Sequence, residues 1–159
     1  DLENNVFYYL GRANEALGNA EEMQRCLKLA ARGEAKPQQA MYYNDQPPEM
    51  IFYQALANQK LGNRTDAERI FQALVAYGEE HEDDDVKMDY FAVSLPDFLV
   101  FDPDLNAKNR THCRFVQALG HLGLGNLDRA NDLFDRVLAK DPAHAGAVLH
   151  SRLVQEDPV

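Results

Sequence analysis

The sequence predicts an all-α protein in which antiparallel helical hairpins stack into a short right-handed α-solenoid, with a helical segment inserted between two of them. The first observation is a Leu-Gly-Asn triplet that recurs at residues 17–19, 61–63 and 124–126. Glycine reaches positive φ without a steric penalty, so it commonly ends one helix and lets another begin at once. The second observation is that apolar residues three and four positions apart flank each triplet, which is the spacing of one helix face.

These signals divide the chain into elements that we expect to form one domain over residues 1–159. The expected elements are hairpins at about 2–32, 48–78 and 105–140, an insert at 79–104 and a closing helix at 143–154. In the third hairpin, the second helix carries its apolar stripe at Leu127, Ala130, Leu133, Phe134, Val137 and Leu138. The closing helix should cover the end of the stack with Ala145, Val148 and Leu149, while His144 and His150 should lie near solvent.

The spacing between the triplets is unequal, so extra residues follow each of the first two hairpins. Residues 33–48 are rich in proline and predict a loop. The insert carries apolar residues at helical spacing, namely Met88, Phe91, Ala92 and Leu95. The apolar segment Phe98–Phe101 follows Pro96, which suits the first turn of a further short helix. This segment should be buried, either under the hairpins or against a partner.

The composition excludes several classes of function. The chain has 16 Lys and Arg against 26 Asp and Glu, a net charge of −10, and such a surface would repel nucleic acid. No apolar run approaches the length of a membrane span, so we expect neither a nucleic-acid nor a membrane partner, and a cytoplasmic location. Cys26 and Cys113 lack metal or redox spacing and should be reduced, buried residues. The sequence begins with Asp and shows no leader, so it should be part of a longer protein.

Three short patterns imitate functional sites, and each is better explained otherwise. The glycines of residues 120–126 have the reverse of dinucleotide-binding spacing and end a helix. Residues 102–106 begin like a calcium loop but lack its later glycine and glutamate, so Asp104 or Asn106 should be a helix N-cap. His112, Cys113 and His121 are not at zinc-ligand spacing. We therefore predict no catalytic residue, no cofactor and no metal.

The hairpins resemble the tetratricopeptide repeat, whose unit of roughly 34 residues has small residues where its helices cross, a turn glycine, an aromatic residue and a closing proline. The third hairpin matches best, through Ala118, Gly125, Ala130, Phe134 and Pro142. The second matches through Ala55, Gly62, Ala67 and Phe71. The first departs from the pattern, because Gly11 stands opposite Met23 where the others pair two alanines. The resemblance implies a helical array that binds a protein or peptide.

Stacked hairpins of this kind present a concave face that is built from their first helices. The repeat places these residues on that face: Tyr8, Arg12, Glu15, Phe52, Leu56, Gln59, His112, Phe115 and Leu119. Aromatic residues with few charges suit an apolar peptide or helix. Arg12 is the one basic residue among them, which argues against a clamp for a terminal carboxylate. The alternative is that these side chains belong to the core.

The preferred function is a noncatalytic protein–protein interaction or scaffold module within a larger protein, which binds a peptide, a helix or a neighbouring domain in its groove. Candidate partners include a missing N-terminal part of the same chain, and the incomplete N-terminal end also suits a homodimer.

Several segments resemble the C-terminal repeat region of large bacterial proteins in which a β-rich domain precedes tetratricopeptide-like repeats. The segments are DYFAVSLPDFLVFDPDLNAKNRTHC, ALGHLGLGN and VLAKDPAHAGA. This resemblance implies a connection with carbohydrate. The alternative function is therefore an accessory or substrate-binding region of a carbohydrate-acting enzyme, for which Asp97 and Asp102 are the carboxylate pair to test.

Overall fold

The computed structural model describes residues 3–37, 46–86 and 104–156, and every regular element in these ranges is an α-helix. The helices are α1 (Asn4–Ala16), α2 (Ala20–Ala30), α3 (Pro48–Lys60), α4 (Arg64–His81), α5 (Leu105–Gly123), α6 (Leu127–Lys140) and α7 (Ala145–Glu156). The all-α prediction is confirmed. The predicted helices of the insert, with Phe98–Phe101, Asp97 and Asp102, lie outside the described residues.

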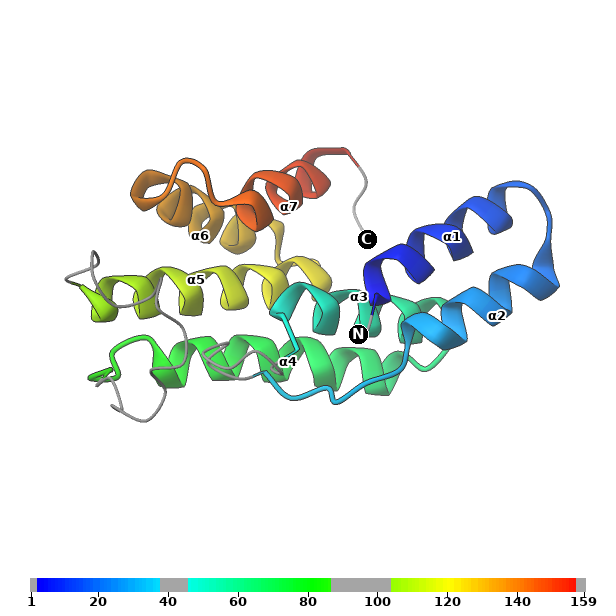
Figure 1. Ribbon diagram of the computed structural model, residues 1–159, viewed down its shortest axis with the longest axis horizontal. Coiled ribbons are helices and arrows are strands. Elements are labelled where there is room, and N and C mark those ends of the chain that lie inside the picture. The colour runs from blue at the N-terminus through cyan, green and yellow to red at the C-terminus, as the bar shows by residue number, and fades with distance from the viewer. Residues whose placement is uncertain (1–2, 38–45, 87–103, 157–159) are drawn as a thin grey trace, which may run out of the picture.

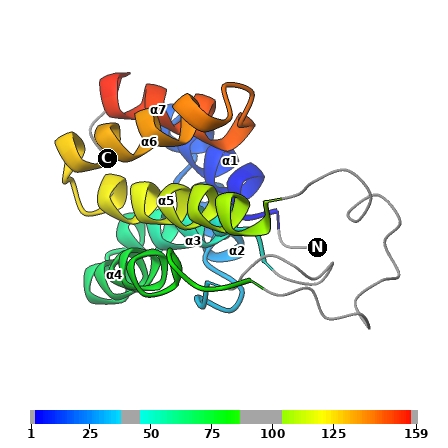
Figure 2. The ribbon, with the colours of Figure 1, turned by 90° about the vertical axis from the view of Figure 1, so that its left-hand side faces the viewer.

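Consecutive helices pair into hairpins, and the hairpins stack (Figure 1). α1 packs against α2, α3 against α4, and α5 against α6. Each later first helix also packs against both helices of the hairpin before it: α3 against α1 and α2, and α5 against α3 and α4. α7 continues the series by packing against α5 and α6. Figure 2 shows α5 between α4 on one side and α6 on the other, the layered contact that a helical-repeat fold requires.

Each hairpin turns at the glycine of a Leu-Gly-Asn triplet. Gly18, Gly62 and Gly125 have φ angles of +76°, +88° and +76°. At the second turn, the Gly62 amide donates to the Gln59 carbonyl at 3.1 Å and the Asn63 amide donates to the Asn58 carbonyl at 2.9 Å. This pair of bonds closes a helix around a left-handed residue. An added Cβ would touch nothing at any of the three turns, so the requirement for glycine is conformational.

The helices α4 and α5 approach each other closely, and glycines make this possible. A Cβ on Gly78 of α4 would strike the Cys113 carbonyl of α5. A Cβ on Gly120 of α5 would lie 2.7 Å from the Phe71 carbonyl of α4, and one on Gly123 would strike the Phe71 ring. Backbone therefore meets backbone here. Gly120 and Gly123, which lie near the third turn in the sequence, serve helix packing.

Within the first hairpin, the crossing contact differs from the prediction. A Cβ on Gly11 would lie 2.9 Å from Leu27 Cδ2, so Leu27 rather than Met23 fills the space beside this glycine. Leu27 is buried, whereas Met23 is half-buried. The prediction is wrong by one helical turn, because residues four apart lie on the same face of α2.

The closing helix α7 contributes a histidine to an aromatic core. His150 is 1% exposed, and its ring centre lies 5.5 Å from that of Phe52 and 6.1 Å from that of Phe115. The prediction that His150 lies near solvent is therefore wrong. The buried side chains of α7 are Ala147, His150 and Val154, whereas Ala145 and Leu149 are exposed. The helix was predicted correctly, but its buried face was not.

Candidate binding surface

The residues that the repeat places on the concave face divide into two groups. Tyr8, Phe52, Leu56, Phe115 and Leu119 are buried in the main hydrophobic cluster, as the alternative core interpretation expected. Arg12, Glu15, Gln59 and His112 are exposed or half-buried. Glu15 connects two hairpins, because its carboxylate lies 2.8 Å from Lys60 Nζ of α3 and 3.6 Å from Arg12 Nε of its own helix. A groove at these positions stays a prediction, and its accessible part is polar.

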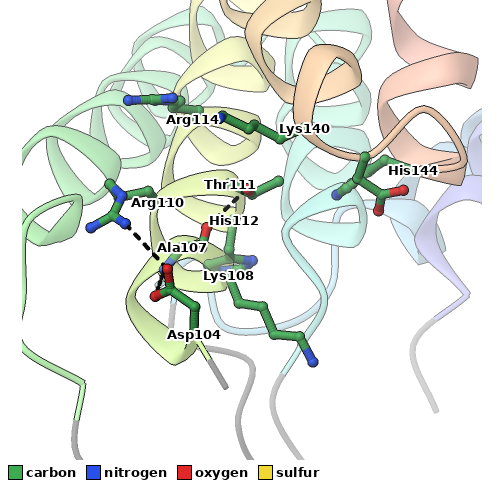
Figure 3. Close-up of a pocket in the computed structure, with 10 residues that line it drawn as sticks. Asp104, Ala107, Lys108, Arg110, Thr111, His112, Arg114, Lys140 and His144 are labelled. Carbon is green, nitrogen blue, oxygen red and sulfur yellow. Dashed lines mark hydrogen bonds and ion pairs between the residues drawn. The ribbon is translucent and has the colours of Figure 1, made fainter. Parts of the chain in front are cut away.

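A separate cleft of about 680 Å³ opens between the first half of α5 and the connection from α6 to α7 (Figure 3). Its lining includes His112, the one residue of the predicted groove that reaches it. The residues that carry charge around it are Asp104, Lys108, Arg110, Arg114, Lys140 and Asp141. The cleft volume falls in the range of sites that hold a small molecule or a short peptide segment, roughly 300 to 1,000 Å³.

The first turns of α5 form one wall of the cleft. Asp104 caps this helix, because its carboxylate accepts a hydrogen bond from the Ala107 amide at 2.8 Å, as the sequence predicted for this residue or Asn106. Thr111 Oγ1 donates to the Ala107 carbonyl at 2.9 Å and stays within its own helix. The capped start lets α5 extend beyond its hairpin with α6, so that it presents Lys108 and Arg110 at the cleft.

The α6–α7 connection forms the opposite wall. α6 ends at Lys140, and the Asp141 carboxylate accepts from the Ala143 amide at 3.1 Å. His144 Nδ1 accepts from the Ala147 amide at 3.1 Å, which fixes the first turn of α7. The His144 ring also packs on Phe115, with ring centres 4.6 Å apart. The buried Phe115 therefore supports this wall from the core side.

Positive charge predominates in the cleft. Lys108, Arg110, Arg114 and Lys140 face Asp104 and Asp141, and both carboxylates accept backbone hydrogen bonds at helix ends. Arg114 Nε lies 2.7 Å from Glu82 Oε1, and Arg110 lies 4.0 Å from Asp104. Lys140 makes no ion pair with any described residue. A positive cleft on a chain whose net charge is −10 is a local reversal of the overall field.

Some of these basic residues could be expected from the sequence. Lys108 precedes His112 by four residues, so it lies on the same face of α5 one turn earlier. A predicted groove that extended one turn further toward the start of α5 would have included Lys108. Lys140 offered no such signal, because a lysine in the last turn of a helix is already explained by the negative C-terminal end of the helix dipole. Its place in the cleft depends on how α6 packs against α5.

Burial sets the protonation of the nearby core groups. Burial raises the pKa of Cys113 to about 12, so the thiol stays protonated at neutral pH. Cys113 and Cys26 are buried and free, as predicted. Burial also lowers the pKa of His150, whose Nδ1 donates to the Gly146 carbonyl at 2.7 Å. Neither Cys113 nor His150 lines the cleft, whose lining carries four lysine and arginine side chains.

Residues 49–77, which comprise α3 and most of α4, match the sequence model of the tetratricopeptide repeat. A comparison with solved structures found no match. Among the described residues, no helix has the length and apolarity to cross a lipid bilayer. The hairpins on either side of the matched residues repeat the same turns and the same stacking. The chain is therefore a tetratricopeptide-repeat-like helical protein, of a kind that generally mediates contacts between proteins.

Proposed function

We propose that the described residues form a noncatalytic interaction module that holds an acidic segment of a partner protein in the cleft between α5 and the α6–α7 connection. The observation that supports the proposal is the gathering of Lys108, Arg110, Arg114 and Lys140 around one cleft of an acidic protein. The proposal assigns the module no catalytic residue, no cofactor and no metal. It differs from the apolar groove that the sequence suggested, because the accessible positions are charged.

Electrostatics favour this cleft over the rest of the surface. A partner with Glu or Asp side chains is repelled by a chain of charge −10 and attracted where the lysines and arginines line the cleft. Arg114 is held by Glu82, which leaves Lys140 as the side chain best able to reach a new carboxylate. Because charged contacts in a partly exposed cleft are screened by salt, binding should weaken as the ionic strength rises.

The partner is expected to offer side-chain carboxylates on an extended or helical segment. The residues that line the cleft come from α5, the end of α6 and the α6–α7 connection (Figure 3), which suits a segment lying along α5. The Phe115 ring lies behind His144 and is itself buried, so it does not serve as an accessible anchor in the cleft. Specificity should therefore depend on charge spacing more than on a buried anchor.

A binding titration tests the proposal. The probe is a fluorescein-labelled peptide made of repeated Glu-Glu-Leu triplets, and its binding is measured by fluorescence anisotropy. The control peptide has Gln in place of every Glu. Replacing both Lys108 and Lys140 by Glu should raise the dissociation constant for the acidic peptide by tenfold or more, about 1.4 kcal/mol. The matched control replaces Lys28 and Lys36, two exposed lysines outside the cleft, by Glu, so that both double variants change the net charge equally.

The outcomes separate the cleft from general electrostatics. If the Gln peptide bound as tightly as the Glu peptide, carboxylates would not contribute to binding. An equal loss in the control with Lys28→Glu and Lys36→Glu would show attraction by overall charge alone, and either result would refute the cleft as the binding site. Circular dichroism of each variant checks that the helices remain intact.

A further inference from the structure

The side of α1 that faces away from its own hairpin carries an exposed apolar stripe. Val6, Leu10 and Leu17 are 47%, 45% and 74% exposed, and Ala13 between them is also exposed. These four residues, here called the α1 outer face, recur at helical spacing on one side of the helix. The buried residues of α1 lie on the other side, at Asn4, Tyr8 and Gly11.

The equivalent positions in α3 and α5 are covered. Aligning the turn glycines places Val6, Leu10, Ala13 and Leu17 at the positions of Met50, Gln54, Ala57 and Leu61 in α3, and of Cys113, Gln117, Gly120 and Leu124 in α5. Each of these equivalents in α3 and α5 is buried or half-buried. The element that each helix meets on this side is the second helix of the preceding hairpin, α2 for α3 and α4 for α5.

The α4–α5 interface shows how such a helix sits. Along α5, Gly120 faces Phe71 and Val75 of α4, and Cys113 faces Gly78. The order of contacts is reversed between the two helices, so α4 runs antiparallel to α5 (Figure 1). The α1 outer face is the next position in this stacking series, and among the described residues no helix covers it.

We infer that the α1 outer face is a docking site for an amphipathic α-helix that runs antiparallel to α1, in the position that α2 takes on α3. A second copy of the chain is a poor source for that helix. The stacking sides of α2, α4 and α6 are already occupied by α3, α5 and α7 of the same molecule. Two copies would also bring together net charges of −10. The α1 outer face of a second copy is the remaining alternative, which the oligomeric state tests below. The occupant that we infer is a helix of a partner.

The small residue at the centre of the face lets a neighbouring helix come close. In α5 this residue is Gly120, which lies against the Phe71 carbonyl and the Val75 side chain of α4. In α3 it is Ala57, and the residue of α2 at the position of Val75 is the smaller Ala31. In α1 it is Ala13, so its partner should resemble α2 and carry a small residue at the position of Ala31.

The end of the partner helix should be apolar. Gln54 of α3 donates to the Ala31 and Gly33 carbonyls beyond α2, at 3.2 and 2.9 Å. Gln117 of α5 similarly donates to Glu82 beyond α4, at 3.1 Å. The equivalent residue of α1 is Leu10, which offers no hydrogen bond. If the docked helix placed a polar group opposite Leu10, that group would be buried without a hydrogen bond, which would weaken binding.

A peptide titration followed by methyl NMR tests the docking site. The probe is a synthetic peptide of residues 19–33, which contains α2, with Cys26→Ala to prevent oxidation. Because a peptide of this length is only partly helical in water, weak but saturable binding is expected. The methyl signals of Val6, Leu10 and Leu17 should shift together as the peptide is added. A control peptide that also carries Leu27→Asp should shift none of them.

Matched protein variants decide where the peptide binds. Leu10→Glu should weaken binding by tenfold or more, whereas Leu149→Glu, which changes the comparably exposed leucine of α7, should leave it unchanged. Shifts confined to Met50 and Leu124 methyls, or equal binding by the Leu10→Glu protein, would overturn the proposal. A dimer that Leu10→Glu dissociates in sedimentation experiments would also overturn it, in favour of a second copy as the occupant.

Discussion

The first helices of the first and third hairpins, α1 and α5, hold equivalent places in the repeat, yet their outer faces differ. On α5, glycines bring the backbone of α4 close, and the residues along the contact are buried or half-buried. On α1, the same positions carry Val6, Leu10 and Leu17, which remain accessible. The turns and the inward faces are similar in both hairpins. The repeat therefore specifies the hairpin itself, while the outer residues specify how closely another helix can approach.

The largest expected effect comes from placing the same side chain on both outer faces. Gly120→Leu should destabilise the protein by about 2 to 3 kcal/mol, because the new side chain would collide with the α4 backbone. Within a helix, leucine is more stable than glycine by about 0.8 kcal/mol. A loss of stability in Gly120→Leu must therefore come from the collision. The matched Ala13→Leu should change the free energy of unfolding by less than about 0.5 kcal/mol. Urea unfolding measures both, and equal effects would abolish the distinction between the two faces.

A smaller effect is expected at the turns, where the hairpins are alike. Gly62→Ala should cost about 1 to 2 kcal/mol, since φ is +88° and an L side chain is strained there. The added Cβ would contact nothing, so Gly18→Ala and Gly125→Ala should cost similar amounts. Urea unfolding measures the loss of stability in all three variants. A much larger loss at one turn would mean that this turn makes a contact that the other two lack.

The hydrogen bond from Gln117 to Glu82 should contribute less. Gln117→Leu removes this bond from the α4–α5 interface, and the expected loss is about 1 kcal/mol. The reciprocal Leu10→Gln on α1 should be nearly neutral, because position 10 is half exposed to water. A comparable loss in Leu10→Gln, measured by thermal unfolding, would mean that the α1 outer face is already engaged in an interaction.

The smallest expected effect concerns pH at the other end of the stack, where α7 covers α5. Burial lowers the pKa of His150 below its ordinary value of 6.5, so the unfolded chain binds the proton more readily. The stability that His150 contributes is complete above pH 6.5 and declines as the pH falls from there toward the folded-state pKa. His150→Leu should remove this part of the pH dependence. Unfolding curves at several pH values should therefore be more nearly parallel for the variant between neutral pH and about pH 5.

Much of the fold could be predicted from local signals in the sequence. The turns were predictable because glycine at positive φ is a local requirement, and the helix pairs followed from apolar residues at helical spacing. The buried face of α7 could not be predicted in this way. Ala145, Val148 and Leu149 have helical spacing, and so do Ala147, His150 and Val154. The buried face of α7 is determined by tertiary contacts, because His150 packs against Phe52 and Phe115, which are distant from it in the sequence.

The binding cleft was less predictable than the fold. Positions such as Phe52 and Leu119 were predicted to line the groove, but neighbouring helices cover them completely. Whether an inward residue lines a groove or lies in the core depends on how closely the hairpins stack, which no local pattern records. The cleft combines the start of α5 with the end of α6, so Lys108 and Lys140 meet through tertiary packing alone.

The two cysteines make the motions of this stack observable without added labels. Cys113 is fully buried beneath Gly78 in the α4–α5 interface, and Cys26 is buried in α2 of the first hairpin. A thiol reagent reaches either sulfur only during a transient opening, so its modification rate reports the free energy of that opening. The ratio of the two rates compares the breathing of the terminal hairpin with that of the central pair of helices in a single sample.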